Sequence, residues 1–132
     1  MIDSVSKALR TKLVGTSAVT NVVSTRIYNT HVPEGVSLPF IVFQHVAGGT
    51  TNETPTDALD VQFQVKAVSE NDAQAAAVEA LIRAALHNVQ LTTQDGWLFY
   101  DCEHLNPFFL REDVDRRQVF SAGGTYRIRA HQ

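Results

Sequence analysis

The chain of 132 residues is 44% hydrophobic and 19% charged, and it carries a formal net charge of -3. This size is usual for one domain, and the composition argues against a disordered chain. The net charge gives no reason to expect nucleic-acid binding through the field of the whole protein, which leaves only a local basic patch open. We therefore expect residues 1–132 to form a single globular domain with its own core.

The single cysteine, Cys102, excludes a disulfide within the chain. The amino terminus lacks the basic-then-apolar pattern of a secretory signal, and no apolar run approaches the roughly 20 residues that span a bilayer. We expect a soluble protein that is made in the cytoplasm and has no membrane partner.

The first third of the chain predicts helices followed by extended segments. Apolar residues with helical spacing, ended by Gly15, predict a helix over residues 3–14. Residues 16–24 favour a second, short helix, although their valines are poor helix formers. Residues 26–28 form a short extended piece, and the β-branched and aromatic residues over 40–46 predict a strand.

The clearest pattern lies in residues 58–86. Apolar and polar residues alternate over 58–68, which predicts a half-buried strand. From Glu70 onward the apolar residues fall three and four apart, which predicts a helix over 70–87. Ser69-Glu-Asn-Asp72 approximates a capping box for that helix.

The last third predicts strands separated by turns. Residues 89–92 are a candidate short strand, and Asp95-Gly96 indicates a turn before a strand over 97–105. The last strand covers 118–131, where Gly123-Gly124 indicates a bend or bulge.

Two long loops connect these elements. Residues 48–57 are polar and contain Pro55, so they predict a loop between two strands that we pair antiparallel. Asn106-Pro107 ends the strand before it, and residues 106–118 predict a second loop. Long loops in compact domains are often functional.

The order of these elements predicts an α+β two-layer sandwich. Its sheet has four strands, mainly antiparallel, and two helices pack on the face that carries Val61, Phe63 and Val65. The outward face of the same strand meets solvent in a monomer. In an assembly it instead meets a neighbour or lines a channel, and the sequence leaves these alternatives open.

Asp101-Cys102-Glu103-His104 is the densest group of reactive side chains. On a strand Cys102 and His104 share a face, so a nucleophile or part of a metal site is one interpretation. No second cysteine, oxyanion hole or further spaced ligand accompanies them. We favour ordinary strand residues here, and we expect no enzyme activity, cofactor or metal.

Two other groups of residues suggest surfaces for a partner. Arg127 and Arg129 share one face of the last strand, but no aromatic residue is interleaved with them, so a protein partner or solvent is favoured over nucleic acid. Phe108-Phe-Leu110 either caps the core or forms a contact patch, and both interpretations stay open.

Several sequence phrases occur in the order of a known family. A first helix ends in Leu13-Val-Gly15, and Arg26-Ile-Tyr28 and Leu38-Pro-Phe-Ile-Val-Phe43 follow. An amphipathic strand then enters an alanine-rich helix with a Ser-x-x-Asp cap, and the last strand contains Tyr126-Arg-Ile128. Over nearly its whole length the chain resembles the tail-completion or tail-terminator proteins of long-tailed bacteriophages.

The resemblance implies a structural protein of the virion tail or neck, without catalytic residues. Members of this family form a ring, commonly of six copies, at the head-proximal end of the tail tube. The ring stops tube growth and presents a surface to the head connector. The implied partners are further copies of the chain, the tail tube protein and a head-completion or connector protein. DNA enters only as cargo that passes through the channel.

The family offers no residue signature to transfer, so the contacts are predicted from the two long loops and their charges. Alternating charge over residues 111–117 would suit register-setting contacts between copies. The candidate contacts are Thr51, Glu53, Phe108, Phe109, Leu110, Arg111, Asp113, Asp115, Arg116 and Arg117.

Two alternatives remain beside the tail terminator. One is another neck ring protein, such as a head-completion or stopper protein. The other is a small cytoplasmic binding domain or enzyme that uses the face of Cys102 and His104. Ring proteins should tolerate Cys102→Ser, whereas the enzyme should be sensitive to it.

Overall fold

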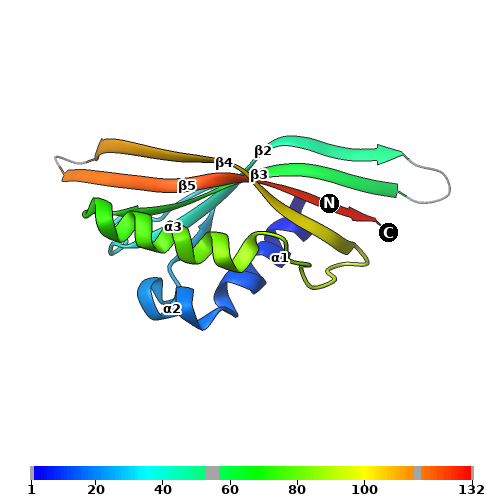
Figure 1. Cartoon of the computed structure of the whole chain (residues 1–132), viewed down its shortest axis with the longest axis horizontal. Coiled ribbons are helices and arrows are strands. Elements are labelled where there is room, and N and C mark those ends of the chain that lie inside the picture. The colour runs from blue at the N-terminus through cyan, green and yellow to red at the C-terminus, as the bar shows by residue number, and fades with distance from the viewer. Residues whose placement is uncertain (1, 53–56, 115–116, 132) are drawn as a thin grey trace.

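The computed structural model describes residues 2–52, 57–114 and 117–131. Within them a five-stranded sheet forms one layer, and three helices lie together on one of its faces (Figure 1). The α+β two-layer architecture is as predicted. The predicted four strands and two helices are corrected to five strands and three helices in the described residues. The sheet is mainly antiparallel, as predicted, and one parallel pair makes it mixed.

The amino-terminal helices are α1 (Ile2–Val14) and α2 (Ser17–Val23), close to their predicted bounds. The buried stripe of α1 consists of Val5, Ala8, Leu9 and Leu13. Helix α2 has only seven residues, and its Thr16 cap makes no side-chain hydrogen bond to the helix amides. Burial of the valines therefore contributes more to the stability of α2 than the intrinsic helix propensity of its residues does.

The fifth strand is β1 (Ile27–Asn29), which the sequence indicated only as an extended piece. It pairs parallel with β2 (Phe40–Asn52) over Ile41–Phe43 and makes the sheet mixed. The strand order is β1-β2-β3-β5-β4, so β4 forms the opposite edge.

Strands β2 and β3 (Asp57–Ser69) pair antiparallel, as predicted, but over a longer stretch. The ladder continues to Asn52 and Asp57, so the predicted loop over 48–57 is largely a hairpin instead. A register shift between His45 and Ala47, and a φ of 84° at Gly48, let the strand twist while pairing continues. Residues 53–56 lie outside the described residues.

Helix α3 (Asp72–Leu86) follows β3 almost at once, as the change of apolar period predicts. Its cap is Asn71 and not the predicted Ser69. The Asn71 side chain accepts hydrogen bonds from the amides of Ala73 (2.8 Å) and Gln74 (3.3 Å). Asn is as good a cap as Ser, and here it stands at the residue where the helix begins. The Ser69 hydroxyl instead accepts from the Asn71 amide at 3.2 Å.

Strand β4 (Leu98–Val114) runs through Asn106-Pro107, where the sequence predicted its end. Proline is tolerated because β4 is an edge strand, in which alternate backbone N–H groups point away from the sheet and have no ladder partner to lose. The predicted loop over 106–118 is therefore a second hairpin, in which Val114 pairs with Arg117 of β5 (Arg117–His131). The predicted short strand over 89–92 does not form.

The predicted bulge at Gly123-Gly124 is also absent, because both glycines pair with β3 in continuous register. The irregularities lie in β4, next to Tyr100 and Leu105. A Cβ added at Gly123 would lie 2.2 Å from the Val65 carbonyl oxygen. Glycine is therefore required at this position by close approach of the neighbouring strand.

The core lies between the sheet and the helices, on the predicted face of β3. Val61, Phe63 and Val65 are fully buried there. The largest other buried side chains are Tyr126, Phe43, Phe99, Leu9 and Leu13. No helix in the described part of the chain is long and apolar enough to cross a bilayer.

Two hairpins extend from this core toward opposite ends of the molecule (Figure 1). The first, called here the β2–β3 arm, joins residues 48–52 to residues 57–61. The second, called the β4–β5 arm, joins residues 108–114 to residues 117–123. None of the helices in the described part of the chain lies on the opposite face of the sheet, called here the open face (Figure 1).

Candidate assembly surfaces

The predicted contact residues lie on the two arms and so at two ends of the molecule. Phe108, Phe109, Leu110 and Arg111 belong to the β4–β5 arm, whose ladder also contains Asp113 and Arg117. Thr51 pairs with Ala58 in the β2–β3 arm. Glu53, Asp115 and Arg116 lie outside the described residues. One surface cannot contain both sets.

The apolar cluster of the β4–β5 arm is divided between the two faces of the sheet. Phe109 pairs with Ala122, on the helix side, whereas Leu110 pairs with Ser121, on the open face. Their side chains are 52% and 50% exposed. The Phe109 ring lies 6.0 Å from the ring of Phe120, centroid to centroid. Half-exposed apolar side chains on an extended arm are more typical of a contact surface than of a core cap.

One half of the open face carries paired charges. The Arg127 guanidinium donates to both carboxylate oxygens of Asp60, at 2.9 and 2.6 Å. Arg129 pairs with Asp101 and lies over the ring of Tyr100, 5.7 Å from its centroid. The hydrogen bond from Arg127 lowers the pKa of Asp60. Both arginines considered as phosphate contacts are thus held by a carboxylate of a neighbouring strand.

The other half of the open face holds an apolar groove of about 190 Å³, called here the open-face groove. Its floor follows the register of the sheet, in which Phe40 pairs with Val68 and Val42 with Lys66. Its lining consists of Thr30, Val32, Phe40, Val42, Gln44, Gln64, Lys66, Val68 and Val119. Sequence reasoning missed this groove because its residues come from four separate segments.

Cys102 lies in the molecular interior and His104 is half-buried on the same face of β4, and their geometry disfavours a nucleophile. The cysteine is 1% exposed, and burial raises the pKa of its thiol to about 12, so the thiol stays protonated at neutral pH. The His104 ring packs on Tyr126 at 5.2 Å, centroid to centroid. Burial lowers the pKa of His104. The described residues contain no group of three or more side chains able to hold a metal ion.

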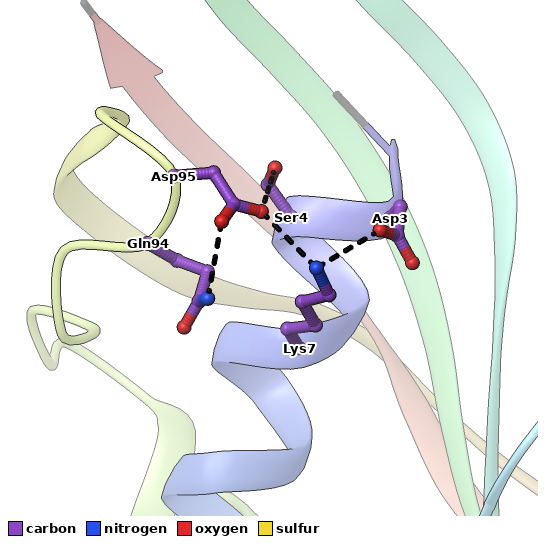
Figure 2. A network of polar contacts seen from close by, with 5 residues as sticks. All are labelled: Asp3, Ser4, Lys7, Gln94 and Asp95. Carbon is purple, nitrogen blue, oxygen red and sulfur yellow. Dashed lines mark hydrogen bonds and ion pairs between the residues drawn. The ribbon is translucent and has the colours of Figure 1, made fainter.

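A polar network that the sequence did not predict fastens α1 to the turn before β4 (Figure 2). Asp95 accepts hydrogen bonds from the Ser4 hydroxyl at 2.8 Å and from the Lys7 ammonium at 3.4 Å. The Ser4 hydroxyl is the main cause of a lowered pKa at Asp95. Asp95-Gly96 forms the predicted turn, with φ values of 52° and 82°. The network joins α1 to a turn that lies 91 residues away in the sequence.

Comparison with known proteins connects this fold to virion proteins. Residues 7–130 match the family described as Tail completion protein gp17. Because the match spans nearly the whole chain, the chain belongs to this tail completion family. It is a structural component of a virion, located in the tail or neck.

A solved structure described as "Virion of native gene transfer agent (GTA) particle" contains a chain with a similar fold. The TM-score is 0.78, and the similarity covers 99% of this chain and 97% of that chain. The sequence identity is 15%, so this likeness concerns the fold alone. A comparison with curated proteins gives no match.

Proposed function

We propose that this chain forms a closed ring, commonly of six copies, at the head-proximal end of the tail tube. The ring ends tube polymerisation and joins the tail to the head. The observation that carries this proposal is the β4–β5 arm, which extends beyond the core with half of Phe109 and Leu110 exposed. Membership of the tail completion family supplies the context.

The shape of the subunit suits a head-to-tail contact. A ring requires two different patches on each copy, so that every copy meets its neighbour in the same way. An edge strand with exposed apolar residues risks uncontrolled aggregation unless a partner covers it. Assembly into a ring would cover the β4–β5 arm and remove that risk.

The partners in this proposal are further copies, the tail tube protein and the head-completion or connector protein. In this proposal the candidate contact residues of the two arms meet different members of this set of partners. DNA passes through the channel as cargo. We also propose that residues 1–132 form one domain, because the described elements share one continuous core.

The test combines light scattering with negative-stain microscopy, with and without cognate tail tubes. We expect rings, or density on one end of each tube. Phe109→Ser should abolish both while leaving the circular dichroism spectrum unchanged. Leu98→Ser is the matched control, because Leu98 is 43% exposed but lies at the other end of β4. A protein that stays monomeric at high concentration and never decorates tubes would refute the proposal.

The same experiment separates the alternatives. A head-completion or stopper protein would form rings yet leave tube ends bare. A small enzyme would require Cys102, whose buried and protonated thiol gives that hypothesis no support.

A further inference from the structure

The subunit carries an exposed aromatic side chain and an apolar groove at the same end of its sheet. Phe109 pairs with Ala122, which pairs with Ala67. One residue further along β3, Val68 lines the open-face groove. The aromatic ring and the groove are therefore only about one residue apart along the strands.

They nevertheless lie on opposite faces of the sheet. Ala67 belongs to the core, so Phe109 projects on the helix side. Successive residues of a strand alternate between faces, so Val68 and the groove lie on the open face. A chain cannot place its own Phe109 in its own groove, because the sheet stands between them.

The groove has the size and chemistry for one such ring. An apolar cavity on the order of 150 Å³ holds a benzene molecule, and the groove measures about 190 Å³. Its apolar floor contains Val42, Val68 and Val119, all nearly buried. Gln44 and Gln64, joined at 3.3 Å, supply carbonyl and amide groups at the same place. Arg111 lies on the same face as Phe109, two residues along β4, with its guanidinium facing the side-chain amide of Gln118, and its remaining N–H groups can donate to such oxygens.

We propose that, in the ring, Phe109 of each copy inserts into the open-face groove of the next copy. The occupant of the groove is thus a second copy of this chain, through the helix-side surface of its β4–β5 arm. Because the two surfaces face opposite ways, the contact is heterologous and repeats in one direction around a ring. This inference rests on the proposed ring and names the surfaces that close it.

The test uses pairs of cysteines in one chain. In Arg111→Cys/Gln44→Cys, which keeps Phe109, the two thiols lie on opposite faces, so any cross-link between them joins two chains. A short bismaleimide linker, added to the assembled protein on tail tubes, should give a ladder of covalent oligomers on a denaturing gel. Arg111→Cys/Leu98→Cys is the matched control. Leu98 pairs with His131 on the open face, but far from the groove along the strands.

The outcomes separate this inference from the proposed function. A ladder in the Gln44 pair, with no products beyond dimers in the control or in either variant that carries only one of the two added cysteines, supports the contact. Tubes capped by rings without that ladder would overturn the contact and leave the ring standing. A cross-link from position 111 to the tube protein would overturn it as well. Absence of both rings and ladder would overturn the proposed function and this inference together.

Discussion

Replacing Gly123 by alanine tests whether the central strands approach as closely as described. The added Cβ would lie 2.2 Å from the Val65 carbonyl oxygen and 2.7 Å from the Lys66 Cα. Both atoms belong to the backbone of β3, which is paired on both sides and cannot shift cheaply. Overpacking costs about 1–3 kcal/mol, and a backbone clash in the middle of a sheet should reach the upper end, about 3 kcal/mol.

The expected destabilisation of Gly123→Ala is large enough to be measured. A domain of this size has a free energy of unfolding of about 5–15 kcal/mol, so Gly123→Ala should still fold. A loss of about 3 kcal/mol lowers the midpoint of thermal unfolding by roughly 10 °C. Urea unfolding, followed by circular dichroism, measures the free energy directly.

Gly49 provides the matched control in a strand. A Cβ added there would meet nothing within 4 Å, and its φ is not positive. Gly49→Ala should therefore change the free energy of unfolding by less than about 1 kcal/mol, in the stabilising direction. If the two variants differed by less than about 0.5 kcal/mol, the described packing of β3 on β5 would be wrong.

Three further predictions concern single side chains. Asp60→Asn should lower the thermal midpoint at pH 7, because Arg127 lowers the pKa of Asp60. Because the pKa of Asp60 is lowered, its ionised form adds stability above the ordinary carboxyl pKa of about 4, and this stability is lost on acidification. The difference in thermal midpoint between Asp60→Asn and wild type should therefore shrink below that pH. A difference that is the same at every pH would exclude a stabilising ion pair between Asp60 and Arg127. Cys102→Ala should assemble like wild type, and a thiol reagent should label Cys102 only on unfolding; rapid native labelling would contradict its burial. Tyr126→Phe should keep or raise urea stability by up to about 1 kcal/mol, because the Tyr126 hydroxyl is buried without a partner among the described residues. A loss of more than about 1 kcal/mol would reveal such a partner.

Local periodicity was sufficient to predict a helix or strand wherever that element buries one face. The alternation in β3 and the change to helical spacing in α3 are visible in the sequence, because each pattern records which side chains meet the core. The same is true of α1. The cap of α3 was misplaced by two residues, since Asn71 and Ser69 are equally acceptable caps and only the final hydrogen bonds distinguish them.

The arms could not be predicted from local signals. Gly48-Gly49 and Asn106-Pro107 are turn signals in isolation, but pairing with a neighbouring strand overrides them. Proline at residue 107 is harmless only because β4 is an edge strand, which depends on the strand order. Strand β1 has three residues, too few for a periodic pattern, and it exists through its pairing with β2.

The candidate surfaces were predictable in composition but not in arrangement. The cluster at Phe108 was visible as apolar residues outside the predicted core. Its division between two faces depends on the register of β4 and β5. Gln64 and Lys66 read as solvent-facing residues, and only the sheet brings them beside Phe40 and Val119 in one groove.

The most direct test of the ring is the growth of tail tubes. Purified tubes are incubated with this protein, washed, and then supplied with fresh tube subunits, and tube lengths are measured by electron microscopy. The proposed function predicts that growth stops at the end that carries the protein, whereas tubes treated with Phe109→Ser continue to lengthen. Equal lengthening of tubes with and without the wild-type protein would contradict it.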